Sequence, residues 1–240
     1  MEIRNTVRTQ QIAARFAGFF YLFTMATALF AEDYALGGVW RSHDPGATAR
    51  NIEAAEQLFR LGIVCELVTV AGVAALIVAL YVLLNTVNRG LALLALSWRM
   101  LECVLLAMAA ACPLVVLRLL SGADYLAPYN IHQLQTSAYV ALEAHSIGYL
   151  TGMFFYSLGS TAFSYLLFKS HYVPRLLPAL GVLGSLIVFA GTVVHFAAPQ
   201  YAAAVESVFW IPVAAYEVLL GLWLLFLGVK ISPPEARAAA

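Results

Sequence analysis

The stretch from Gln57 to Leu84, QLFRLGIVCELVTVAGVAALIVALYVLL, decides the fold. A membrane-spanning helix needs about 20 mostly apolar residues, and this stretch is long enough with only two charged side chains, Arg60 and Glu66. Because backbone groups cannot bond to water inside hydrocarbon, we expect a helix here. Five other stretches have the same character, so the sequence predicts six spans, at about 13–31, 57–84, 90–119, 136–168, 176–197 and 206–230.

The composition agrees with a membrane protein. Hydrophobic residues make up 62% of the chain and charged residues only 11%, whereas soluble domains have about a quarter charged residues. The formal net charge of +0 gives no indication of a nucleic-acid partner. We therefore predict an all-α fold, a six-helix transmembrane bundle formed by one multi-pass domain over residues 1–240, with the lipid bilayer as its surroundings and the oligomeric state open.

The basic residues predict the orientation of the bundle. If the N-terminus is cytoplasmic, the outer loops hold three arginines, whereas the inner side holds eight basic residues: Arg4, Arg8, Arg15, Arg89, Lys169, Arg175, Lys230 and Arg237. Cytoplasmic loops carry an excess of Lys and Arg. Both termini are thus predicted to lie in the cytoplasm, and the protein is predicted to lie in the cytoplasmic membrane of the cell.

The first apolar stretch has an alternative interpretation as a cleaved signal peptide. A basic start and an apolar run lead to Ala26, Thr27 and Ala28, which have the small-x-small pattern of a cleavage site. The apolar run continues to Ala31, as a span would. Cleavage would leave five spans, and the intact mass of the purified protein distinguishes the two.

Six ionisable residues lie inside the predicted spans: Glu66, Arg99, Glu102, Glu143, His145 and Glu217. A charge at the bilayer centre is unfavourable by about 3 kcal/mol, so such groups face one another or a wet cavity. At a helical rise of about 1.5 Å per residue, the four glutamates and His145 fall near one level, slightly outside the midplane, and Arg99 lies about one turn below Glu102. The sequence therefore predicts a buried polar cluster.

Acids outnumber bases in this predicted cluster. Four glutamates accompany one arginine and one histidine, and several buried carboxylates cannot all stay ionised, so at least one should hold a proton near neutral pH. Such a cluster suits proton coupling, cation binding or acid–base chemistry, although buried ion networks also occur in purely structural roles. Arg99 would be the counter-ion and His145 a proton relay.

The chain lacks the sequence signatures of cofactor and metal sites. Cys65, Cys103 and Cys112 have no C-x-x-C or Cys/His spacing, and no nucleotide-binding or metalloprotease motif occurs. The sequence predicts no cofactor and no metal, and it identifies no catalytic residue. The leading hypothesis is proton-coupled handling of a small solute or ion, so the protein is not expected to be an enzyme. The alternatives are an intramembrane enzyme using a carboxylate and His145, or a structural or regulatory bundle.

Several motifs along the chain carry a family resemblance. They are RFAGFFYL at 15–22, TARNI at 48–52, LFR at 58–60, WRMLE at 98–102, PR at 174–175 and EVLLGLWL at 217–224. With them the chain resembles the bacterial membrane-protein family called domain of unknown function 4386, over nearly its whole length. The resemblance implies a multi-pass protein of the bacterial inner membrane, and it brings no activity, substrate or cofactor.

Overall fold

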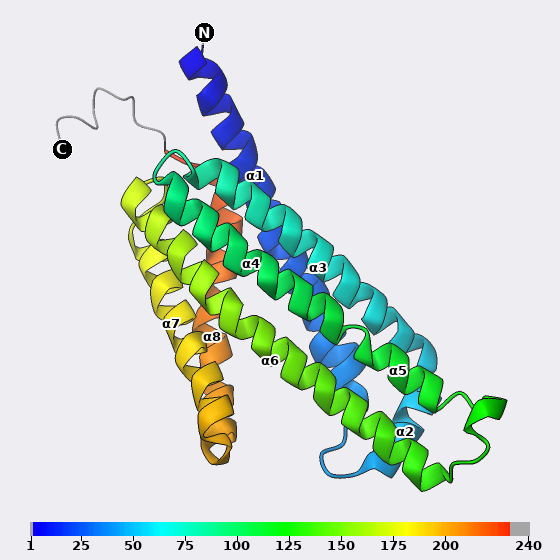
Figure 1. Cartoon of the computed structure of the whole chain (residues 1–240). Coiled ribbons are helices and arrows are strands. Elements are labelled where there is room, and N and C mark those ends of the chain that lie inside the picture. The colour runs from blue at the N-terminus through cyan, green and yellow to red at the C-terminus, as the bar shows by residue number, and fades with distance from the viewer. Residues whose placement is uncertain (1, 231–240) are drawn as a thin grey trace. The chain divides into compact units, whose positions relative to one another are not determined.

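The computed structural model describes residues 2–230, which form helices and connecting turns with no strand among them (Figure 1). The predicted all-α fold is confirmed. Met1 and residues 231–240, which include the C-terminal end predicted to be cytoplasmic, lie outside the described residues.

Eight α-helices follow one another along the described chain. They are α1 (Glu2–Ala28), α2 (Pro45–Ala54), α3 (Glu56–Leu84), α4 (Arg89–Ala109), α5 (Cys112–Leu119), α6 (Ile131–Ser170), α7 (Leu176–Ala197) and α8 (Ala202–Leu222). Two of them continue as π-helices, α1 through Leu29–Leu36 and α8 through Trp223–Leu227. Single turns of 3-10 helix occupy Gly37–Val39, Asp124–Leu126 and Pro199–Tyr201.

Local chemistry explains where several helices begin. Asp44 caps α2, because its Oδ1 accepts a hydrogen bond of 2.8 Å from the Ala47 amide. Asn130 and Gln133 cap α6 reciprocally, each side chain accepting a hydrogen bond from the backbone amide of the other. Pro113 lies in the first turn of α5, where its missing N–H is tolerated. The stretch predicted as one span at 90–119 therefore breaks into α4 and α5.

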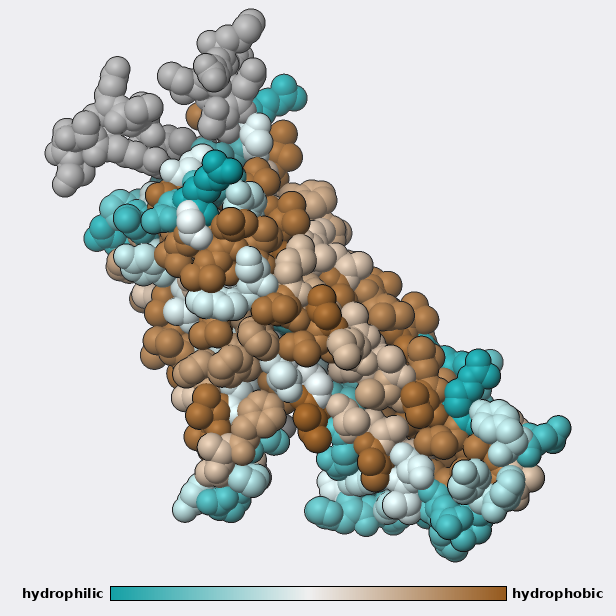
Figure 2. Space-filling view, viewed as in Figure 1, coloured by the Kyte–Doolittle hydropathy of each residue, from teal (hydrophilic) through white to brown (hydrophobic). Residues whose placement is uncertain are grey.

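Within residues 2–230, five helical stretches are long and apolar enough to cross a membrane, namely Val7–Val39, Glu56–Leu84, Arg89–Leu119 (α4 with α5), Leu176–Ala197 and Trp210–Leu227. Figure 2 shows hydrophobic side chains over the sides of the helices and hydrophilic side chains toward their ends. These are the features of a membrane protein. The long helix α6 is not among the five, because Ser, Thr, Gly and Tyr are interspersed with its apolar residues. The count of six spans and the cytoplasmic termini remain predictions.

The chain divides into two compact units, and each boundary between them falls inside a helix. Unit 1 contains Met1–Phe23, Val73–Met100 and Met153–Ala240, and unit 2 contains Thr24–Gly72 and Leu101–Gly152. The single multi-pass domain stays a prediction from the sequence.

Within unit 1, helices α7 and α8 lie side by side (Figure 1). A glycine permits their close approach, since a Cβ atom at Gly184 would lie 3.3 Å from the backbone of Val213. A Cβ atom at Gly18 of α1 would clash with the backbone nitrogen of Leu225, in the π-helix that continues α8. Small residues at such crossings are typical of membrane helices.

Unit 2 has an apolar core at the end that carries α2. Its buried members are Leu36, Val39, Ile52, Phe59, Ile63, Val116, Leu117, Ala138 and Leu142. These residues come from the π-helix after α1, from the 3-10 turn Gly37–Val39 that follows it, and from α2, α3, α5 and α6. The core therefore fixes the helices that carry the candidate site described next.

Candidate functional site

Two glutamates and a histidine meet in unit 2. The Nε2 atom of His145 lies 2.6 Å from Oε1 of Glu66, a hydrogen-bond distance, and 3.9 Å from Oε1 of Glu32. One potential ligand atom from each side chain lies within 4.8 Å of the other two. We call these three residues the acidic site.

A glycine on α3 brings two of the three residues together. Gly62 is buried, and a Cβ atom there would lie 2.7 Å from the Cβ of Ala35 in the π-helix. Glu66 follows Gly62 by four residues, so both lie on the same face of α3. Glu32 is on the same π-helix as Ala35. The close approach at Gly62 therefore places the two carboxylates near each other.

His145 comes from the buried face of α6. Ala138, Leu142 and His145 recur at spacings of four and three residues, and all three are buried. The first two pack in the apolar core of unit 2. The core therefore holds the face of α6 that presents the imidazole to the acidic site.

The acidic site is largely shielded from its surroundings. Glu66 is 7% exposed and His145 is 6% exposed, while the side chain of Glu32 is 25% exposed. Oε2 of Glu66 is buried and has no hydrogen-bond partner among the residues that the structure describes. Buried polar atoms normally have such a partner, so this oxygen is available to a further ligand.

The donor atoms of the acidic site suit a cation. Carboxylate oxygens and an imidazole nitrogen are the ligands of zinc and of related divalent metals. The same three groups can also bind and release protons. An anion or an apolar molecule would find no complementary group among them.

A second polar cluster lies in unit 1. The guanidinium carbon of Arg99 lies 4.5 Å from the ring centroid of Tyr156, a cation–π contact, and the Tyr156 hydroxyl donates a hydrogen bond of 2.7 Å to Glu217. Ser164 donates to the hydroxyl of the buried Tyr216. Tyr156 thus connects the two charged residues of this cluster, Arg99 through its ring and Glu217 through its hydroxyl group.

The predicted cluster residues are distributed over both units. Glu66 and His145 are in direct contact in unit 2, and Glu102 is buried in the same unit. Arg99 and Glu217 belong to unit 1, with the contacts given above. The structure therefore brings four of the six predicted residues into two local arrangements, Glu66 with His145 and Arg99 with Glu217 through Tyr156, which are described separately.

The predicted burial of Glu143 is wrong, because its side chain is exposed. Glu143 precedes the buried His145 by two residues, and two residues turn an α-helix by about 200°. The two residues lie at similar depths along the helix, but their side chains point in nearly opposite directions.

Glu32 is the site residue that the sequence analysis missed. The predicted first span ended at residue 31, so Glu32 was assigned to the connection that follows. In the structure the helix continues as a π-helix to Leu36, and π-helical segments are frequent at functional sites. The sequence did offer one signal for Glu32, since an acidic residue directly follows the apolar run that ends at Ala31.

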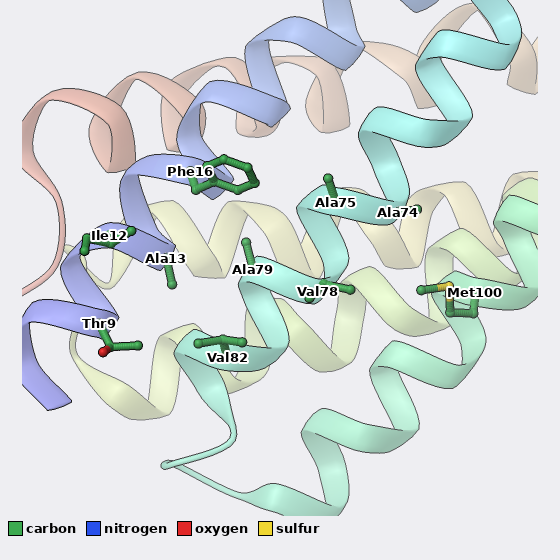
Figure 3. Close-up of a pocket in the computed structure, with 10 residues that line it drawn as sticks. All are labelled: Thr9, Ile12, Ala13, Phe16, Ala74, Ala75, Val78, Ala79, Val82 and Met100. Atoms are coloured by element: carbon green, nitrogen blue, oxygen red, sulfur yellow. The ribbon is translucent and has the colours of Figure 1, made fainter. Parts of the chain in front are cut away.

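An apolar groove of about 570 Å³ lies in unit 1, between α1 and α3 (Figure 3). Ile12 and Phe16 line it from α1, Val78 and Val82 from α3, and Met100 from α4. The groove offers no charged group to a ligand, and it contributes nothing to the acidic site.

Comparisons with known proteins place the chain in a family. No curated protein and no solved structure matches the sequence. One family profile, described as Domain of unknown function (DUF4386), matches residues 16–228. This match covers most of the chain and includes Glu32, Glu66 and His145, and the protein therefore belongs to that family of unknown function.

Proposed function

We propose that this membrane protein binds and moves a small cation through the acidic site of unit 2. The observation that carries the proposal is the contact of 2.6 Å between His145 and Glu66, with the second carboxylate of Glu32 at 3.9 Å, in a largely buried position. Two acids held together in this way attract positive charge. Ionisable residues inside membrane segments are typical of ion and proton pathways.

The charge distribution of unit 2 supports a cation as the ligand. The unit has no lysine, and its four arginines, Arg41, Arg50, Arg60 and Arg118, are all exposed. Within unit 2 the two carboxylates therefore have no buried lysine or arginine as a counter-ion, and His145 is the one basic side chain beside them. A mobile cation can take that role.

The proposal includes coupling to protons. A metal ion binds the deprotonated forms of carboxylate and imidazole, so protons compete for the same atoms. Cation binding at the acidic site would therefore release protons, and this exchange is the basis of the proton coupling that we propose.

We also propose that the protein lies in the bacterial cytoplasmic membrane with both termini inside. The support is the excess of basic residues on the predicted inner side and the resemblance described above. Six spans would then cross the bilayer, with α6 as the fourth.

Flux measurements in proteoliposomes test the proposed function. Protein is reconstituted with a pH-sensitive or metal-sensitive dye inside, and uptake is followed after a cation or proton gradient is imposed. The wild type and Glu143→Gln should show uptake, whereas Glu66→Gln and Glu32→Gln should lose most of it. Equal uptake in all four proteins would contradict the proposal. So would a lower melting temperature in the site variants with no change in uptake, because that result would indicate a structural role.

A further inference from the structure

The charge of the acidic site distinguishes between classes of cation. Glu32 and Glu66 together carry two negative charges when both are ionised, and the arginines of unit 2 are exposed. A monovalent cation balances one of these charges. A divalent metal ion balances both, and in a buried environment this difference is large because charges are weakly screened there.

The geometry of the three donors is close to that of a metal site. A tetrahedral ion with bonds of about 2.0 Å to nitrogen and oxygen holds its ligand atoms about 3.3 Å apart. His145 Nε2 is 2.6 Å from Glu66 Oε1 and 3.9 Å from Glu32 Oε1. One contact is shorter and the other longer than this separation. Small side-chain rotations would equalise them.

A second, independent observation points to a ligand at the same place. Oε2 of Glu66 is buried without a hydrogen-bond partner in the described part of the chain, and Glu66 is only 7% exposed. A buried carboxylate oxygen without a donor is destabilising, because it has lost its hydrogen bonds to water and gained none in return. Coordination of a metal by this carboxylate would remove that penalty.

From these observations we infer that Glu32, Glu66 and His145 bind a divalent transition metal ion of the Zn²⁺ or Mn²⁺ type. The inference rests on the proposed function, since it names the cation of that site. The imidazole nitrogen favours such ions over Mg²⁺ and Ca²⁺, which prefer oxygen ligands. Three protein ligands leave a position open for water or a transported group. This departs from the sequence prediction that the protein has no metal site.

Metal binding by the purified protein tests the inference. Full-length protein in detergent is stripped with a chelator, equilibrated with ZnCl₂ or MnCl₂, and analysed for bound metal by mass spectrometry and for affinity by calorimetry. We expect one ion per chain in the wild type. Mg²⁺ and Ca²⁺ should bind at least about tenfold more weakly.

Matched variants assign the ion to its ligands. Glu32→Gln, Glu66→Gln and His145→Gln should each weaken binding at least about tenfold, because each removes one of three ligands. Glu143→Gln is the control, since it removes an exposed acid on the same helix as His145 and should bind like the wild type. Unchanged binding in all three site variants would overturn the inference. If a site variant fails to fold, the stoichiometry of the wild type still decides, and a wild type that binds no metal would overturn the inference outright.

The flux assay separates this inference from the proposed function. Metal binding that requires the three ligands, without any cation uptake in proteoliposomes, would support the metal site and contradict transport. Uptake that depends on Glu66, in a protein that binds no transition metal, would support transport and overturn the metal site.

Discussion

The pairing of His145 with Glu66 makes a quantitative prediction about stability. The two side chains are 2.6 Å apart and are 6% and 7% exposed. Removing one partner of a buried hydrogen bond leaves the other polar group unsatisfied and is unfavourable by about 1–3 kcal/mol, whereas replacing both partners with apolar residues is often nearly neutral. Glu66→Leu and His145→Phe should therefore each destabilise the protein, and the double variant should be destabilised by much less than their sum.

The expected coupling energy between these two substitutions is about 2–3 kcal/mol. Hydrogen bonds between membrane helices average about 0.6 kcal/mol and reach about 1.7 kcal/mol, and a short, buried hydrogen bond to a carboxyl group should exceed that range. The assay is a double-mutant cycle of unfolding free energies in detergent, with a chelator present so that metal binding does not contribute. The cycle of Glu66→Leu with Glu143→Gln is the control and should be additive. A coupling of less than about 0.5 kcal/mol between Glu66 and His145 would refute the reasoning.

Two further predictions concern the elements that hold unit 2 together. Gly62→Ala places a Cβ atom 2.7 Å from the Cβ of Ala35, so it should lower the free energy of unfolding by about 1–3 kcal/mol and weaken cation binding. The control Gly90→Ala, at an exposed helical glycine where the nearest neighbouring atom would lie 3.6 Å from the new Cβ, should not destabilise the protein. Thermal melting in detergent compares the two variants, and equal effects would show that the close approach at Gly62 is unimportant. Asp44→Ala removes the hydrogen bond from the Ala47 amide and should destabilise α2 by about 1 kcal/mol. Backbone amides in the first turn of α2 should then exchange their hydrogens faster than in the wild type, and unchanged exchange would contradict this prediction.

The helices were predictable because apolar length is read directly from the sequence. The span predicted at 57–84 corresponds to α3 at Glu56–Leu84, and the span at 176–197 to α7 at Leu176–Ala197. The break between α4 and α5 was less accessible, because a proline within an apolar run can kink a helix or end it. The continuation of α1 as a π-helix had no sequence signal that the helical period could reveal.

The candidate site was predictable only in part. Depth along a helix correctly drew attention to Glu66 and His145, since acids and histidines are rare within spans. It could not decide between His145 and Glu143, which differ in direction and hardly in depth. Glu32 was missed because its contact with Glu66 depends on the close approach at Gly62, which is a tertiary feature.

The most direct test of the central claim is X-ray absorption spectroscopy of the zinc-loaded or manganese-loaded protein. We predict that nitrogen and oxygen atoms surround the metal at about 2.0–2.2 Å, with the scattering of one imidazole ring, and that this imidazole signal is lost in His145→Gln. A shell containing sulfur at about 2.3 Å, or a spectrum without imidazole scattering in the wild type, would contradict the claim that Glu32, Glu66 and His145 form a cation site.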